Sequence, residues 1–194
     1  MSLREPSVQI QNIVATASFN VEIDMYTLER KVENIEYDPN RFPGLIYRLE
    51  EPRATVLIFR SGRAVIAGTK SVNDVIRAVK KLIRAFKQIN IEIKETPKVQ
   101  VQNIVATANF HGIIHLEKAS YLLENTMYEP EQFPGLVYRM EKPRAVILFF
   151  VSGKAVIAGV RREEDVYKAT KNAYEILVQN GCIIPHEETE EELL

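Results

Sequence analysis

The sequence is short of the residues on which several classes of protein depend. Its 194 residues include one cysteine, Cys182, and no tryptophan. A single cysteine excludes an internal disulfide and a cysteine-rich zinc site, and it agrees with a reducing compartment. The longest uninterrupted apolar run, Ala145 to Val151, is far shorter than the roughly 18 residues of a membrane span. Met1–Pro6 lacks the apolar core of a signal peptide. We therefore expect a soluble intracellular protein.

The sequence also lacks the usual signatures of catalysis. It contains no glycine-rich phosphate loop, no nucleophile elbow and no repeated Cys/His pattern. The best candidate for a metal site is His111 with His115, four residues apart and close to Glu117. These histidines lead into a predicted helix cap and no third ligand is evident, so a structural role is the stronger interpretation. We expect a protein that is not an enzyme, with a metal enzyme as the alternative.

What the sequence does contain is a tandem duplication. The segment QNIVATA at Gln11–Ala17 returns 91 residues later at Gln102–Ala108. The same displacement relates FPGL, PRA and SG segments without a gap, and about 40 of 87 aligned positions are identical. We predict a first repeat over residues 1–95, a second repeat over residues 96–185 and an acidic, disordered tail over residues 186–194. Two such repeats are expected to contact a ligand in pseudo-twofold fashion.

The charge is unevenly distributed. The formal net charge is −1, but the last eight residues hold five glutamates, so the rest of the chain is mildly basic. Such an asymmetry favours an anionic partner, although an acidic end is more often only a solvated one.

Each repeat is predicted to contain about five strands and two helices. Val8–Phe19 alternates like a strand, Asp24 is predicted to cap a short helix, and Ala54–Arg60 with Arg63–Gly68 form a predicted hairpin. Ser71 followed by Asp74 resembles a capping box before a longer helix with a basic face. The hairpin strands are apolar on both faces, whereas a half-buried sheet usually alternates. The second face must therefore dimerise or bind a ligand.

The duplicated segments QNIVATA, RFPGLIYR with QFPGLVYR, EPRA with KPRA, and FRSGRAVIAG with FVSGKAVIAG closely resemble the TATA-box-binding protein family, in its archaeal branch. The resemblance covers about Val8 to Ile184. It implies an α+β fold: a tandem-repeat saddle with a curved ten-stranded antiparallel sheet and four helices on its convex face. It also implies a general transcription initiation factor that binds and bends TATA-element DNA through the minor groove, and recruits transcription factor B and RNA polymerase.

The resemblance assigns roles to individual residues. It implies four DNA-intercalating wedges: Phe42, Phe59, Phe133 and Phe150. It implies contacts with bases and groove by Asn12, Val14, Leu57, Val65, Asn103, Val105, Leu148 and Val156. It implies phosphate contacts by Arg41, Arg48, Arg53, Arg63, Arg139, Arg144 and Lys154, and docking of transcription factor B at Glu129, Glu131 and Gln132. Donors such as asparagine suit the A·T minor groove because it presents only acceptors.

The sequence departs from the family pattern at Ala67 and Ala158, where many members have a hydroxyl residue before the glycine. The family implies no metal and no cofactor, a monomer on double-stranded DNA, and no membrane. It implies a cytoplasmic, nucleoid-associated location in an archaeon, or a nuclear one in a eukaryote. The remaining alternative is a module that binds a small apolar ligand or a partner protein on the same sheet.

Overall fold

The computed structural model describes residues 4–186. Within the first repeat the elements are β1 (Ser7–Ser18), α1 (Met25–Lys31), β2 (Ile35–Glu36), β3 (Leu45–Glu50), β4 (Arg53–Ile58), β5 (Arg63–Thr69) and α2 (Val72–Gln88). Within the second they are β6 (Lys98–Asn109), β7 (Gly112–Ile114), α3 (Leu116–Leu122), β8 (Thr126–Met127), β9 (Leu136–Met140), β10 (Ala145–Phe149), β11 (Lys154–Val160), α4 (Glu163–Gln179) and β12 (Ile183–Pro185). The predicted acidic tail covers residues 186–194, and beyond His186 it lies outside the described residues.

The chain forms two compact units, and the boundaries between them fall inside β1 and β6. Ile10–Ile104 is one unit, and residues 105–186 together with residues 4–9 form the other. The boundary between residues 95 and 96 was predicted from the sequence repeat. As a domain boundary it stays a prediction.

The strands of residues 4–186 build one antiparallel sheet of ten strands and a separate pair. The order in the large sheet is β2-β3-β4-β5-β1-β6-β11-β10-β9-β8, and β12 pairs with β7. β1 and β6 each contribute a part to both units. The predicted α+β class, tandem repeat, ten-stranded sheet and, within the described residues, four helices are confirmed. The β7–β12 pair has no counterpart in the first repeat and was not predicted.

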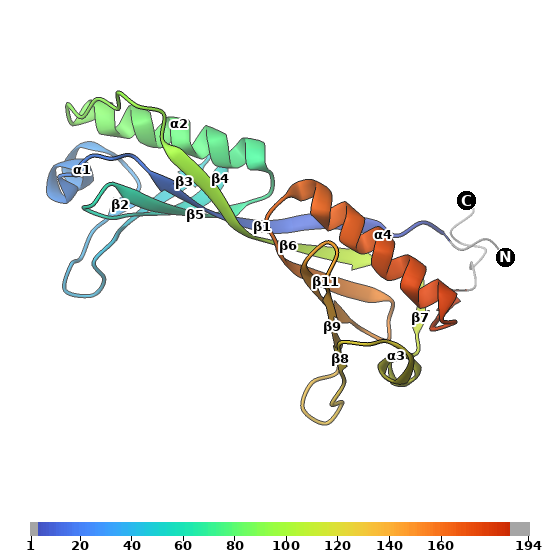
Figure 1. Cartoon of the computed structure of the whole chain (residues 1–194). Helices are drawn as coiled ribbons and strands as arrows, with labels where there is room; N and C mark the ends of the chain where they lie inside the picture. The colour runs from blue at the N-terminus through green and yellow to red at the C-terminus, as the bar shows by residue number, and fades with distance from the viewer. Residues whose placement is uncertain (1–3, 187–194) are drawn as a thin grey trace, which may run out of the picture. The chain divides into compact units, whose positions relative to one another are not determined.

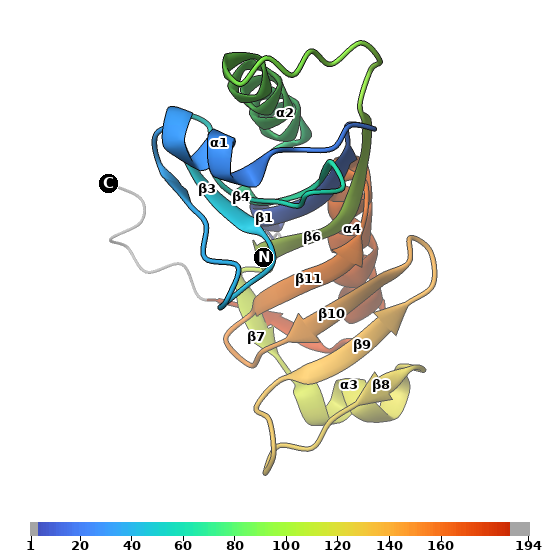
Figure 2. The same ribbon diagram turned by 90° about the vertical axis from the view of Figure 1, so that its left-hand side faces the viewer.

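In each unit a long helix covers one face of the strands (Figure 1). Figure 2 shows α4 behind β9, β10 and β11. Alternate residues of β4 and β5, such as Val56, Ile58 and Ile66, are fully buried, as are Leu82 and Phe86 of α2. Because successive strand residues point to opposite faces, the other half of each strand forms the face that the helices leave uncovered.

The helix starts follow local chemistry. The Asp24 carboxylate accepts from the backbone N–H of Thr27 at 3.1 Å and from its hydroxyl at 2.7 Å, which lowers the pKa of Asp24. The Ser71 hydroxyl accepts from the N–H of Asp74 at 3.0 Å, so both predicted caps are confirmed. No helix among the described residues has the length and apolar character needed to cross a membrane.

Candidate nucleic-acid interface

The uncovered face of the first-repeat strands is apolar at its centre. Leu57 of β4 pairs with Val65 of β5, and Val65 pairs on its other side with Thr16 of β1. All three residues are half-buried, whereas their sequence neighbours Val56 and Ile66 are fully buried. The apolar character of both faces, noted in the sequence, thus corresponds to one face packed beneath α2 and one that the described chain leaves open. We call the second one the open face.

The second repeat has the same open face. Leu148 of β10 pairs with Val156 of β11, and Val105 of β6 is half-buried like its counterpart Val14. The apolar residues predicted to contact DNA therefore occupy matching positions in the two units. Half-buried apolar side chains on a sheet face that no helix covers are typical of a binding surface.

Each repeat places two phenylalanines in contact at a strand end. The rings of Phe42 and Phe59 have centroids 6.0 Å apart at 67°, and those of Phe133 and Phe150 are 5.9 Å apart at 70°. Phe42 is 37% exposed and Phe133 is 40% exposed, while the other two rings are half-buried. All four lie outside the buried core, so core packing does not account for them.

The close packing of these rings requires the glycine that follows each Phe-Pro pair. A Cβ at Gly44 would lie 2.5 Å from Cε1 of Phe42 and 3.0 Å from Cε1 of Phe59. At Gly135 the corresponding separations from Phe133 and Phe150 are 2.7 and 3.0 Å. The φ angle of neither glycine lies in the left-handed region. The glycine of each Pro-Gly pair therefore permits the close approach of two aromatic rings.

The Asn12 side chain is held in one orientation. Its Oδ1 accepts a hydrogen bond of 2.7 Å from the backbone N–H of Gly68. The register of β1 with β5 shifts here, because Ile13 pairs with Thr69 while Ala15 pairs with Ile66, and Gly68 has a φ of 86°. This bulge aims the N–H of Gly68 at Asn12. Since the carbonyl oxygen is engaged, the two amide hydrogens of Asn12 are the donors left for a ligand.

The residues around Asn12 have counterparts in the second repeat. Gly159 has a φ of 80°, and Asn103 is half-buried like Asn12. Ala67 and Ala158 are also half-buried, and Ala67 pairs with Thr55 across β4 and β5. By strand parity, Ala67 lies on the open face of its repeat with Val65, and Ala158 lies on that of its repeat with Val156.

Basic side chains follow the open face. The seven residues predicted to contact phosphate are all exposed: Arg41, Arg48, Arg53, Arg63, Arg139, Arg144 and Lys154. On β4, Arg53 is four positions from Leu57, and on β5, Arg63 is two positions from Val65. Because side chains alternate between the two faces of a strand, each arginine lies on the same face as its apolar neighbour. Arg48 forms an exposed ion pair with Glu36 at 3.3 Å, whereas the position aligned with Glu36 in the second repeat is Met127.

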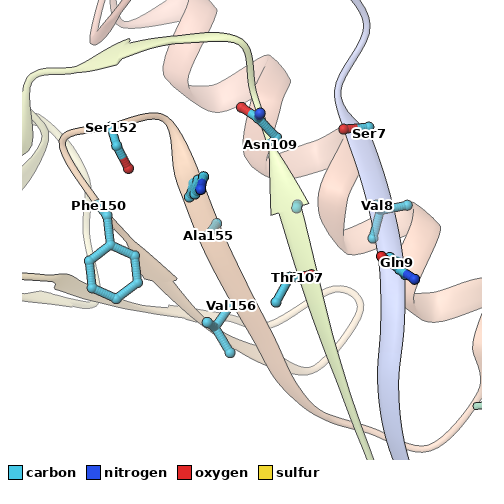
Figure 3. A pocket seen from close by; sticks show the side chains of 11 residues that line it. Ser7, Val8, Gln9, Thr107, Asn109, Phe150, Ser152, Ala155 and Val156 are labelled. Atoms are coloured by element: carbon cyan, nitrogen blue, oxygen red, sulfur yellow. The ribbon is translucent and has the colours of Figure 1, made fainter.

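Two hollows lie beside the phenylalanines. The one in Figure 3 has a volume of about 770 Å³ and is lined by β1, β6 and β11 residues together with Phe150. The other has a volume of about 620 Å³ and is lined by the aligned residues of β1 and β5, Phe59 and the start of β6. The repeat displacement relates Phe59 to Phe150, Arg63 to Lys154, and Val65 to Val156.

The hollows differ in charge because Lys98 in one aligns with Ser7 in the other. Sequence reasoning missed Lys98, Gln100 and Gln102, of which Gln102 donates from Nε2 to the Thr16 hydroxyl at 3.0 Å. The signal available in the sequence was the repeat displacement, which aligns these three residues with Ser7, Gln9 and Gln11 at the start of β1.

The loop before Phe133 presents the residues predicted to dock a partner. The carbonyl of Glu129 accepts from the N–H groups of Gln132 at 2.9 Å and Phe133 at 3.0 Å, which fixes a tight turn. Glu129, Glu131 and Gln132 are all exposed. The first repeat has the same turn at Asp38, so the two loops differ in side chains and not in backbone.

The histidines considered for a metal site lie at structural positions. His111 has a φ of 54° and its Nε2 is 3.3 Å from the Ser7 hydroxyl, while His115 stands at the start of α3. Within residues 4–186, no three His, Cys, Asp or Glu side chains gather in a way that would hold a metal ion.

Taken together, these observations define a tandem-repeat α+β protein in which the strands of each repeat carry a half-buried apolar face with exposed basic side chains. The family described as "Transcription factor TFIID (or TATA-binding protein, TBP)" matches residues 7–89 and 98–180. The TATA-box-binding protein of Sulfurisphaera tokodaii is 55% identical over 183 residues, covering 94% of this chain and 92% of its own. That of Pyrodictium occultum is 51% identical over 181 residues, covering 93% and 91%.

A solved structure agrees with these sequence matches. The Methanococcus jannaschii TBP has a TM-score of 0.79 and 40% identity, covering 89% of this chain and 99% of its own. The chain belongs to the TATA-binding protein family, whose members are general transcription initiation factors that bind TATA DNA. The resemblance of the repeated segments to this family is confirmed.

Proposed function

We propose that this protein binds TATA-element DNA in the minor groove through its open face and bends it. The observation that carries the proposal is the pair of aromatic clusters outside the core, Phe42 with Phe59 and Phe133 with Phe150, beside a half-buried apolar sheet face. An apolar face suits the floor of an A·T minor groove, because a G·C pair would present its amino group there.

The asparagines supply the polar part of the recognition. An A·T pair presents only acceptors in the minor groove, and the Asn12 amide has its two hydrogens available because its oxygen accepts from Gly68. Asn103 holds the aligned position in the second repeat. The apolar contacts would come from Val14, Leu57, Val65, Val105, Leu148 and Val156.

The phenylalanines would act as wedges. Apolar side chains inserted between base steps unstack them and kink the duplex, and TATA-binding proteins are themselves the standard example, with a kink of about 80°. Unstacking is least costly at flexible TA steps, so the wedges would contribute to sequence selection. The exposed arginines and Lys154 would neutralise phosphates beside the opened groove.

Docking of transcription factor B, and through it of RNA polymerase, is the second part of the proposal. It rests on Glu129 and Glu131, which are exposed on a well-defined turn, and on Gln132 beside them. The first repeat has Asp38 and Asn40 at the positions of the glutamates, so the two repeats differ where a partner must select one of them. The relatives named above are archaeal, and we therefore infer a nucleoid-associated site of action in the cytoplasm.

The experiment that tests DNA binding compares a TATA-type duplex with a duplex in which G·C pairs interrupt the element. We expect strong binding only to the first, with affinity that falls steeply as salt rises because phosphate binding releases counterions. Equal binding to both duplexes would contradict minor-groove recognition. Binding without salt dependence would favour an apolar ligand instead.

The docking site is tested by Glu129→Arg with Glu131→Arg. Reversal of two charges on the loop should leave DNA binding within about twofold and should abolish the complex with transcription factor B, because attraction becomes repulsion. A ternary complex of normal strength would place the docking site elsewhere.

A further inference from the structure

The second repeat carries an exposed apolar surface where the first repeat is charged. Ile113, Val151 and Met127 are between 43% and 55% exposed, and Tyr121 and Leu122 on α3 are exposed as well. The aligned first-repeat residues are Glu22, Arg60, Glu36, Arg30 and Lys31. Of these residues, Ile113, Tyr121 and Val151 line one hollow. Apolar side chains that are exposed together, at positions that the other repeat fills with charges, indicate an interaction site.

The corresponding surface of the first repeat carries charged side chains, as is typical of a solvent-exposed surface. Glu22 and Arg60 form an ion pair at 2.8 Å with both side chains more than two-thirds exposed. In the second repeat the same backbone contact is kept, since the N–H of Ile114 donates to the carbonyl of Val151 as that of Ile23 does to Arg60. The ion pair has therefore been replaced by Ile113 and Val151 while this backbone hydrogen bond is kept.

The added strand β12 enlarges the apolar surface. Ile184 of β12 pairs directly with Ile113 of β7, and its side chain is 50% exposed. Residues that are directly opposite in an antiparallel pair point to the same face, so the two isoleucines form one apolar ridge.

Beside this ridge lies a hollow of about 780 Å³. Its lining includes Ile113, Val151 and Ile184, together with Glu117, Tyr121 and Tyr128. In the first repeat the residue aligned with Tyr128 is Tyr37, and the ring of Tyr26 stands edge-on against it with centroids 5.1 Å apart. The residue aligned with Tyr26 is Glu117, so the second repeat has lost the ring that covers this tyrosine.

The hollow itself is lined by one carboxylate, Glu117, and one ammonium, Lys118, and the acidic excess that suits a basic partner lies in the segment around it. From Leu116 to Phe133 the sequence has four carboxylates and one lysine, whereas the aligned first-repeat stretch balances four carboxylates with three cations. The hollow is also continuous in sequence with the docking loop, because Tyr128 precedes Glu129 directly.

We infer that this hollow receives an aromatic or large aliphatic side chain of the same basic protein that docks on Glu129 and Glu131. The inserted side chain would lie against Tyr128 as the Tyr26 ring lies against Tyr37, and the ridge of Ile113 and Ile184 would pack beside it. The inference rests on the proposed docking of transcription factor B. It adds an apolar anchor to that site, which the acidic loop alone does not supply.

The test is to fill the hollow with the ring that the first repeat already has. Glu117→Tyr should weaken the complex with transcription factor B on TATA DNA at least about tenfold and leave DNA binding unchanged. Its control, Glu117→Gln, removes the charge without filling the hollow and should cost less than about threefold. Equal losses in the two variants would overturn the inference, because charge alone would then explain both.

A second variant keeps the test independent of Glu117. Ile113→Glu with Val151→Arg installs the ion pair that Glu22 and Arg60 form, and it should also weaken the ternary complex at least about tenfold. Unchanged affinity of this variant and of Glu117→Tyr, with a loss in the Glu129→Arg and Glu131→Arg variant, would overturn the inference and leave the docking loop in place. No loss in any of them would reject the docking proposal too. Sedimentation of the free protein tests whether a second copy of this chain occupies the hollow instead. A dimer that Glu117→Tyr dissociates, with unchanged binding of transcription factor B, would overturn the inference in favour of that second copy.

Discussion

Replacement of Asn12 by alanine and by aspartate should separate two roles of this side chain. In the structure Oδ1 accepts from the N–H of Gly68 at 2.7 Å, which leaves the amide hydrogens to face a ligand. Alanine removes both functions. Aspartate keeps an oxygen for Gly68, removes the donors and adds a negative charge toward base acceptors and phosphates.

The expected magnitudes follow from these contacts. The loss of one hydrogen bond in Asn12→Ala should cost about 1 kcal/mol of unfolding free energy, which lowers the melting temperature by roughly 2–4 °C in a chain of this size. The loss of donors to base acceptors should cost about 1–3 kcal/mol of binding, or roughly 5- to 150-fold in affinity. Asn12→Asp should melt within about 1 °C of the parent and yet bind DNA more weakly than Asn12→Ala, because of the added charge.

Differential scanning calorimetry and fluorescence anisotropy on a TATA duplex measure the two effects. The matched control is Asn172→Ala, which removes the 3.0 Å hydrogen bond from Nδ2 of Asn172 to the carbonyl of Lys142. Asn172 lies on α4, on the helix side of its sheet, so we expect a comparable effect on melting and none on DNA binding. DNA binding by Asn12→Asp at parental strength would refute the reasoning, because it would mean that the amide hydrogens do not read the groove.

Three further variants test other parts of the open face. Phe133→Ala should weaken DNA binding and reduce the bend measured by energy transfer between duplex ends, while cooperative melting persists because Phe133 is 40% exposed; loss of the fold without a DNA-specific effect would assign the ring to the core. Lys98→Gln should reduce the slope of log affinity against log salt by about 0.9 if Lys98 neutralises one phosphate, and an unchanged slope would make it a solvated lysine. Ala67→Thr should be tolerated and should tighten binding, because a hydroxyl donor would be added on the half-buried open face; a severe loss would show that the groove floor is packed around alanine.

The sequence determined a large part of this fold because its signals are local or repeated. The 91-residue displacement established the duplication, and the alternation of apolar residues located the long strands to within one or two residues. Asp24 and Ser71 were identified as caps from their position before an apolar helical pattern, and both accept the expected N–H bonds. The segments shared with the TATA-binding protein family identified the family itself.

Tertiary structure decided the features that depend on residues far apart in the chain. Periodicity shows that Leu57 and Val56 face opposite ways, but only the packing of α2 decides which face is buried. The bulge that aims the N–H of Gly68 at Asn12 depends on how β1 pairs with β5, and these two residues are 56 positions apart in the sequence. A glycine is needed at position 44 because the rings of Phe42 and Phe59 meet there in the folded protein. The hollow lined by Tyr128 also depends on the fold, because its lining joins Glu117 of α3, at the position of Tyr26 in the first repeat, with Ile184 of β12, which pairs with β7. A local pattern specifies the conformation of a segment, whereas the surroundings of a side chain are set by segments that folding brings to it.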